Sequence, residues 1–451
     1  MASAAEQLAS TLNFGVLAKA SELKKRLWFT MGALILYRLG TYIPIPGIDV
    51  VAFNEMFRQF DGGILGMFDM FSGGALGRMT VFALNVMPYI SASIILQLMT
   101  AVSPRLEALK KEGASGMKVI TQYTRYLTVV LALAQSYGIA IGLEGMRSGA
   151  GGVVVDPGIF FRVSTIFTLT GGTMFLMWIG EQVTQRGIGN GLSLIIMAGI
   201  VANLPRALLS TLELGRTGAM STFFIIILFM VAIGVVFFVV FVERAQRRLI
   251  VQYPKRQVGS RMFGGESSHL PLRLNTSGVI PPIFASSLLL MPSTIGAFSQ
   301  TPGSLMQGSG ILGLIQTYLG HGQPLYMILY VALIVFFAFF YTAIVFNPND
   351  TAENLKKYGG FIPGIRPGKN TSDYLDYVLT RLTCVGAAYL AVVCILPEFL
   401  ISHFAVPFYF GGTSLLIVVT VTMDTVAQIH AHLVAHQYEG LIKKAKLRGR
   451  R

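Results

Sequence analysis

The chain has 451 residues, of which 53% are hydrophobic and only 12% are charged, and its mean hydropathy is +0.63. A soluble domain carries about 25% charged residues, so this composition excludes an ordinary soluble protein and favours an integral membrane protein. The formal net charge of +14 would also fit a nucleic-acid-binding protein. However, the basic residues lie between apolar runs, which is typical of the positive-inside rule.

The N-terminal residues 1–26 are predicted to form a cytoplasmic segment at the membrane surface. Leu8, Leu12 and Val16 recur at near-helical spacing, as expected of a short helix that lies on the inner surface. The apolar run after Arg26 leads into a proline-containing turn and not into a small-residue cleavage site. We therefore expect this run to be the first retained span and not a cleaved signal.

Ten apolar runs are long enough to cross a bilayer. About 20 helical residues span the ~30 Å hydrocarbon core, and backbone groups in lipid must be satisfied internally, so these runs are expected to be helices and not barrel strands. The predicted spans are 27–43, 79–102, 126–143, 163–179, 192–209, 223–242, 279–298, 325–346, 382–401 and 411–434.

The basic residues predict the orientation of these spans. They gather in the N-terminal segment, in the second, sixth and eighth loops and in the tail, whereas residues 274–349, which include the seventh loop, contain no Asp, Glu, Lys or Arg. Both termini are therefore expected in the cytoplasm. An all-α protein of two inverted five-helix halves follows, 27–209 and 210–436, with cytoplasmic loops at about 243–275 and 347–381 and a basic tail at 437–451.

The sixth loop is the most basic segment. From Glu243 to Arg273 it carries seven Lys and Arg residues, and it is long enough to be a docking surface and not only a connection.

A short apolar segment at about 64–78 lies between the first two spans. Some fourteen residues are too few to cross a bilayer. Two interpretations remain open: a surface loop whose Phe and Met side chains dip into lipid, or a short helix folded back into the bundle as a movable stopper, with a glycine pair as its hinge. The residues concerned are Ile64, Met67, Phe68, Met70, Phe71, Gly73 and Gly74.

Several aliphatic residues share helix faces near the ends or middles of spans. Val86 and Ile90 are four residues apart, and Pro88 between them predicts a bend in the second span. Spacing alone places these residues in an ordinary bundle core and does not indicate that they meet. Comparable positions in the fifth, seventh and tenth spans are Leu192, Ile196, Ile283 and Ile417.

Ionisable residues are scarce in the predicted spans. Arg38 is near the outer end of the first span and can snorkel, and Asp424 in the tenth either pairs inside the bundle or relays a proton. His432 and His436 are four residues apart, after His430, but lack the glutamate of an HExxH zinc motif. No nucleophile–base set is legible, so an enzyme is not expected; an ion- or solute-coupled secondary transporter with inverted repeats is the alternative hypothesis.

Five longer motifs resemble the bacterial SecY family, in matching order across nearly the whole chain. The resemblance implies a protein-conducting channel without a cofactor, in which the two halves surround an hourglass pore and a lateral gate lies between the second and seventh helices. The motifs are MFSGGAL at 70–76, PYISASI at 88–94, RGIGNG at 186–191, GIRPG at 364–368 and PFYFGGTS at 407–414.

The same resemblance implies roles for particular residues. Segment 64–78 would be the plug, and the pore waist would be formed by the six aliphatic residues Val86, Ile90, Leu192, Ile196, Ile283 and Ile417. Arg256, Arg261 and Arg366 in the sixth and eighth loops would engage the SecA motor or the ribosome. SecE and SecG would be companion subunits in the bacterial inner membrane, and unfolded preproteins with signal sequences would pass through the pore or leave it into lipid.

Overall fold

The computed structural model describes residues 21–60, 69–145, 147–148, 151–218, 221–253, 256–258, 261–263, 267–299, 323–404 and 412–448. Most of the predicted interfacial segment 1–26 therefore lies outside the described residues, as do Ile64, Met67 and Phe68.

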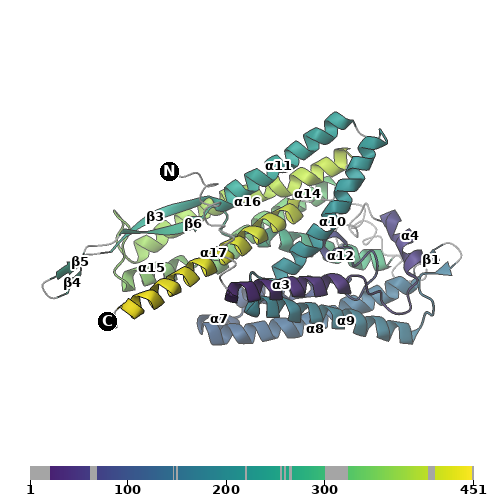
Figure 1. Cartoon of the computed structure of the whole chain (residues 1–451), viewed down its shortest axis with the longest axis horizontal. Helices are drawn as coiled ribbons and strands as arrows, with labels where there is room; N and C mark the ends of the chain where they lie inside the picture. Colours follow the sequence, from purple (N-terminus) through teal and green to yellow (C-terminus); the bar gives the residue numbers. More distant parts are fainter. Residues whose placement is uncertain are drawn as a thin grey trace.

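Long helices that run along or obliquely to the long axis form the body of the molecule (Figure 1). Their bounds are α3 Ser21–Gly40, α4 Val50–Phe60, α6 Met87–Val102, α7 Pro104–Lys111, α8 Ala114–Gly145, α9 Ile159–Arg186, α10 Gly191–Arg216, α11 Thr222–Arg244, α12 Ile280–Ser299, α14 Pro324–Val345, α15 Pro348–Lys357, α16 Lys369–Phe404 and α17 Gly412–Arg448.

Seven helices in the described residues are long and apolar enough to cross a membrane, or eight if α6 and α7, which are bent by 98°, count as one span. The remaining predicted runs coincide with α3 and with the shorter apolar helix α12. Each of the ten predicted runs thus overlaps a helix, which confirms the all-helical fold class. The number of helices that cross the membrane stays a prediction.

The second predicted span begins too early in the sequence-based prediction. Helix α6 begins at Met87, and the chain before it forms turns in which Met79 and Asn85 have positive φ values of 45° and 49°. Pro88 lies in the first turn of the helix, where the missing N–H removes no hydrogen bond. The predicted bend at Pro88 is therefore wrong, because Pro88 lies at the start of the helix and not inside it. The span was predicted to begin too early because apolarity does not distinguish a buried turn from a helix.

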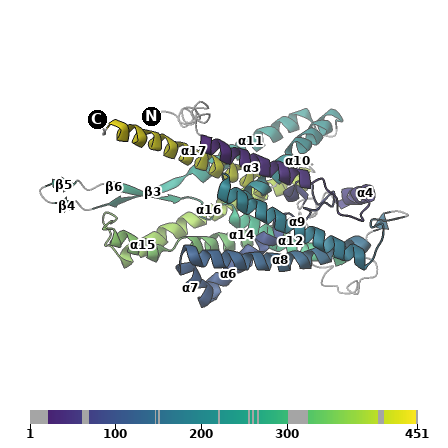
Figure 2. The ribbon, with the colours of Figure 1, turned by 60° about the horizontal axis from the view of Figure 1, so that its bottom comes forward.

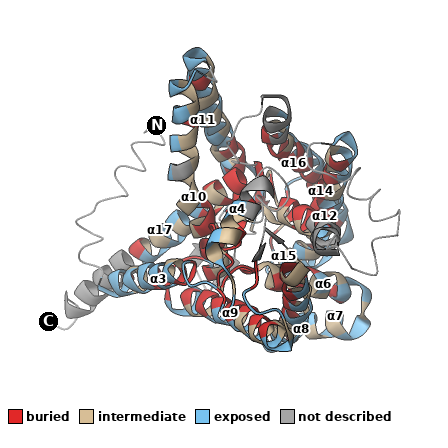
Figure 3. Cartoon of the chain, turned by 90° about the vertical axis from the view of Figure 1, so that its right-hand side faces the viewer, coloured by how far each residue is buried: buried red, intermediate tan, exposed pale blue. Residues whose placement is uncertain are grey.

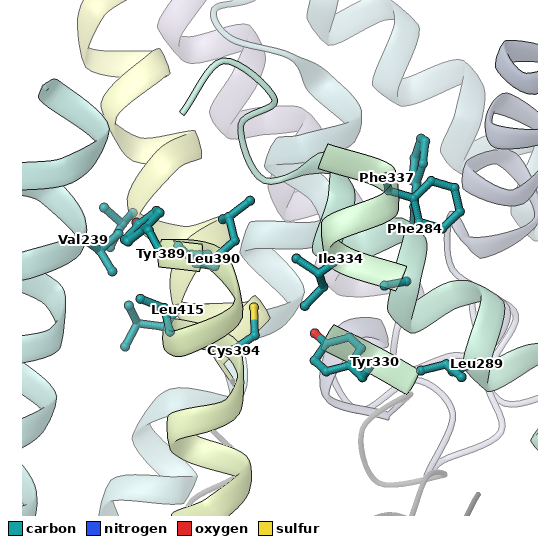
Figure 4. Packing of buried hydrophobic residues seen from close by; sticks show 14 of the residues in the cluster. Val239, Phe284, Leu289, Tyr330, Ile334, Phe337, Tyr389, Leu390, Cys394 and Leu415 are labelled. Carbon is teal, nitrogen blue, oxygen red and sulfur yellow. The ribbon is translucent and has the colours of Figure 1, made fainter. Parts of the chain in front are cut away.

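The two largest apolar cores hold most of the long helices together. The first joins α3, the turns before α6, and helices α9, α10 and α17. The second joins α6, α11, α12, α14, α16 and α17, and Figure 4 shows part of it, where Ile334 and Tyr330 of α14 lie opposite Leu390 and Cys394 of α16. Helix α17 contributes to both cores. Figure 3, viewed along the bundle, shows the buried residues on the inward faces of the helices and the exposed residues outside.

The outward faces are apolar as well. In the most apolar window of α11 only 17% of the residues are buried, and Phe223, Met230 and Phe237, seven residues apart on one face, are each more than two-thirds exposed. In water such a continuous apolar face would be unfavourable. It fits a helix whose outer side contacts lipid.

The sixth predicted loop forms a β-hairpin, and its strands were not predicted from the sequence. Strands β3 (Gln246–Gln252) and β6 (Ser267–Arg273) pair antiparallel, and β4 (Arg256–Val258) pairs with β5 (Arg261–Phe263) at its tip. The hairpin projects beyond the helices at one end of the molecule (Figures 1 and 2). The signal was a short alternation in β3, where Leu249 and Val251 are buried and Ile250 is exposed. A further short pair, β1 (Arg147–Ser148) with β2 (Gly151–Gly152), lies at the other end.

Candidate functional site

A small apolar cavity lies where four parts of the bundle meet. Five of the six predicted waist residues line it: Val86 before α6, Ile90 in α6, Ile196 in α10, Ile283 in α12 and Ile417 in α17. No charged residue lines the cavity among the described residues. The whole lining is Phe71, Asn85, Val86, Met87, Ile90, Ile196, Ile283, Ser286, Ser287 and Ile417.

Spacing along the sequence did not indicate that these side chains meet, and the structure brings them together. Leu192 is the exception, because it packs against the first core and lies outside the cavity lining. It contacts Gly180 of α9 so closely that a Cβ there would lie 2.6 Å from Leu192 Cδ2. That these residues form the waist of a pore stays a prediction.

Residues 69–78, which we call the inner segment, lie directly against this cavity. Met70, Phe71 and Ala75 are all buried, and Phe71 is part of the cavity lining. The described part of the predicted plug is therefore packed inside the protein and is not a loop on the lipid-facing surface. Gly73 and Gly74 have φ values of 70° and 83°, in the left-handed region that glycine adopts without strain.

Three successive backbone carbonyls of the inner segment accept hydrogen bonds from side chains outside it. Asn85 Nδ2 donates to the carbonyl of Phe71 at 2.6 Å, Tyr37 Oη to that of Ser72 at 3.1 Å, and Arg38 Nη1 to that of Gly73 at 2.7 Å. These carbonyls end a single helical turn and have no partner in a continuing helix. The three donors therefore satisfy polar groups that are otherwise costly to bury.

The inner segment also packs directly on the backbone of α10. A Cβ added to Gly199 would lie 2.8 Å from the carbonyl oxygen of Phe71, so only glycine permits this approach. Within the segment, Asp69 Oδ1 accepts a hydrogen bond from the N–H of Gly77 at 2.6 Å. The segment is thus a compact turn that is held by α3, α10 and the residues before α6.

Arg38 does not take the snorkelling position expected from the sequence. Its guanidinium donates to Gly73 and lies 5.1 Å from the ring centroid of Tyr42, whose ring also lies 4.3 Å from the guanidinium carbon of Arg78. This end of the inner segment therefore carries two positive charges.

The other ionisable residues lie apart from the cavity. Of the two interpretations of Asp424, pairing inside the bundle is wrong: its side chain is 57% exposed, and its partner is Arg273 at 4.0 Å. His430 and His432 are exposed, and the side chain of His436 lies outside the described residues. No group of three or more His, Cys, Asp or Glu side chains that would suit a metal ion occurs in the described part of the chain.

The two predicted docking loops pair with each other. Gln252 at the end of β3 exchanges two backbone hydrogen bonds of 2.9 Å with Phe361 in the eighth loop. Arg366 is exposed between Gly364 and Gly368, which have φ values of 82° and 108°. Arg256 and Arg261 lie in β4 and β5 at the hairpin tip, and their side chains are outside the described residues.

Helices α6 and α12, the second and seventh predicted spans, pack against each other beside the cavity. Next to these helices, Lys110 Nζ of α7, which follows α6, donates to the carbonyl of Ile344 in the last turn of α14, which follows α12, at 3.0 Å. A lysine at a helix C-terminus also interacts favourably with the helix dipole. Ile94 of α6 and Phe284 and Leu289 of α12 belong to the second core, so apolar packing holds the seam, and the lysine contact joins the neighbouring helices α7 and α14.

Taken together, apolar helices, an uncharged central cavity and a segment folded against it define a multi-pass membrane protein of the channel class. A family model described as SecY matches residues 80–426, and the chain belongs to the SecY family. It is 54% identical to the protein translocase subunit SecY of Rickettsia typhi, over 95% of this chain and 98% of that protein. It is also 54% identical to the protein translocase subunit SecY of Escherichia coli K12, over 95% of this chain and 96% of that protein.

Solved structures of channels share this fold. One is titled as the structure of a protein-conducting channel, with a TM-score of 0.63 and 17% identity over 90% of this chain and 92% of that one. Another describes the plug domain of SecY and its role in the closed state, with a TM-score of 0.65 and 18% identity over the same shares of the two chains. A third is Sec61 in a canine ribosome–channel complex, with a TM-score of 0.61 and 17% identity, again over 90% and 92%.

Several polar residues at the site were not predicted from the sequence. Asn85, Ser286 and Ser287 line the cavity, and Tyr37 holds the inner segment. The available signal for Asn85 was its position as the one hydrogen-bonding side chain in the run Val81–Met87. Tyr37 gave no comparable signal, because a tyrosine in an apolar helix more often packs than bonds a distant backbone group.

Proposed function

We propose that this chain is the central pore-forming subunit of a protein translocation channel. It conducts unfolded preproteins across the membrane and releases signal sequences and transmembrane segments sideways into lipid. The observation that carries the proposal is the meeting of five aliphatic side chains from four parts of the bundle around one uncharged cavity, with the inner segment against it.

The chemistry of this cavity suits such a channel. Aliphatic side chains offer no hydrogen bonds, so a narrow ring of them blocks ions by excluding water. The same ring yields to any side chain of a passing polypeptide, because it makes no specific polar contacts. On this proposal the inner segment is the plug that closes the ring from one side.

Sideways release requires a seam that opens towards lipid. The contact between α6 and α12 beside the cavity is the candidate, and the driving force is burial of the apolar signal helix in lipid at about 25 cal/mol per Å². The sequence contains no legible nucleotide-binding motif, so the energy for export comes from a partner. SecA and the ribosome fill this role at the basic end, and SecE and SecG are the companion subunits.

The proposed location is the bacterial inner membrane, with both termini in the cytoplasm. The positive-inside rule supports this orientation, because the hairpin, α7, α15 and the C-terminal end of α17 lie at the same end of the molecule (Figures 1 and 2). A secondary transporter would need a polar substrate site at mid-depth. The uncharged lining of the cavity counts against that alternative.

Site-specific crosslinking tests the proposal. A photo-reactive amino acid at Ile90 or Ile283, which line the cavity, is expected to capture a preprotein arrested during export. The matched control is Phe237 on the outer face of α11, which is 76% exposed and is expected to capture lipid. Capture of the preprotein at Phe237 and not at the cavity positions would disprove a central path.

A further inference from the structure

We propose that Asn85 is a latch that makes release of the inner segment depend on an arriving polypeptide. Its side-chain amide holds the carbonyl of Phe71 in the closed state and pairs with the backbone of the passing chain once the segment leaves. This inference rests on the proposed function, and it assigns a positioning role to a residue beside the waist.

The first step is the hydrogen bond itself. Asn85 is 3% exposed, and its Nδ2 lies 2.6 Å from the carbonyl oxygen of Phe71. A carbonyl only accepts, so the amide must present its NH₂ group to Phe71 and its oxygen to the other side. In an apolar surrounding this bond resists displacement, because both groups are costly to leave unpaired.

The second step is that the amide oxygen of Asn85, Oδ1, faces away from Phe71. Asn85 lines the cavity together with Val86, Ile90 and Ile417, and its Oδ1 is buried without a hydrogen-bond partner among the described residues. One side of the same group thus bonds the inner segment, and the other is an unused acceptor beside the proposed waist. An extended polypeptide carries N–H and C=O groups at every residue and can pair with both sides of the amide.

The third step is the backbone. Asn85 has a φ of 49°, in the left-handed region, where asparagine is tolerated better than most residues and glycine best. The turn therefore fixes the direction of the Cα–Cβ bond, and the hydrogen bond to Phe71 fixes the direction of the amide. The turn also supplies a variant, because glycine adopts the same φ without strain and Asn85→Gly removes the amide together with its Cβ.

These steps define an exchange. Without a polypeptide, release of the inner segment leaves the Asn85 amide unpaired beside the aliphatic side chains of the waist, so the closed state is favoured. With a polypeptide in the waist, backbone groups of the passing chain replace the carbonyl of Phe71, and the cost of release falls. A ligand shifts such an equilibrium only by its different affinity for the two states, and the amide provides that difference.

The experiment measures ion conductance of the full chain, assembled with its membrane subunits in planar bilayers and without substrate. Asn85→Gly is expected to raise the open fraction by about two- to tenfold, the change that follows from loss of one hydrogen bond. Tyr37→Phe removes the neighbouring donor to Ser72 without a change of shape and is expected to act in the same direction. Ser136→Ala, which removes a buried hydroxyl in α8 away from the inner segment, is the control and is expected to change nothing.

A channel that lacks residues 64–77 separates the possible outcomes. If Asn85→Gly raises leakage in the intact channel and adds nothing in the shortened one, the latch is supported. Equal effects in both would show that Asn85 acts on the waist directly, which overturns the latch. If the shortened channel leaks but Asn85→Gly does not change the conductance of the intact channel, the latch is overturned and the proposed function still stands. A shortened channel that does not leak more than the intact one refutes the inner segment as a plug, and the latch with it.

Discussion

Among the three predicted docking residues, Arg366 is the one whose side chain the structure describes. It lies between Gly364 and Gly368, which have left-handed φ values, and its side chain is exposed. Its carbonyl accepts a hydrogen bond from Thr371 Oγ1 of α16 at 2.9 Å, and a change of the side chain leaves that backbone acceptor in place. We expect Arg366→Glu to lower motor-driven export about tenfold or more, because a charge-assisted contact with an acidic partner surface becomes a repulsion. Export rates in membrane vesicles, with the amount of inserted chain as the reference, measure this effect.

Lys369 provides the matched control at the residue scale. It is exposed three residues further along, at the start of α16, so Lys369→Glu makes the same change of charge in the same loop. Export that falls equally in both variants would indicate the net charge of the loop and not a specific contact of Arg366. Unchanged export in Arg366→Glu would remove the residue from the docking surface.

At the scale of elements, we expect the tip and the base of the basic hairpin to have separate roles. The base pairs with the eighth loop through Gln252 and Phe361 and packs Leu249 and Leu272 into a small core with Leu375. The tip carries Arg256 and Arg261 in β4 and β5. Replacing residues 254–266 by a short Gly-rich turn is expected to abolish tight binding of SecA or the ribosome while the helices stay folded.

Co-sedimentation of the purified channel with each partner, next to circular dichroism of the helices, checks the hairpin prediction. Unchanged binding by the shortened hairpin would place the docking surface on the base or on the eighth loop. A fall in helicity would show that the tip has a structural role, which the pairing of β3 with β6 does not suggest.

Some of these elements could be predicted from the sequence, and others could not. Long apolar runs such as 223–242 predicted α11 closely, because the requirement for internal hydrogen bonding in lipid leaves only one structure for them. The start of α6 was wrong, because the buried turns before it are as apolar as a helix. The cavity could not be predicted from spacing, since Ile90, Ile283 and Ile417 are far apart in the chain and meet only through the packing of α6, α12 and α17. The resemblance to a family, and not the residue pattern, placed them together.

At the scale of the whole molecule, charge is separated from the apolar body. The formal net charge is +14, and the basic hairpin, α7, α15 and the C-terminus of α17 lie at one end (Figures 1 and 2). If this end binds ribosomal RNA, association releases counterions from the phosphates, and the logarithm of affinity falls linearly with the logarithm of salt concentration, by about 0.7 to 0.9 per phosphate contact. Three or more contacts give a slope of roughly −2 to −3 or steeper.

Ribosome binding measured between about 50 and 200 mM salt tests this expectation, and the shortened hairpin is expected to give a shallower slope. An affinity that does not change with salt would mean that shape and apolar contacts hold the partner, and the basic end would then serve orientation in the membrane alone.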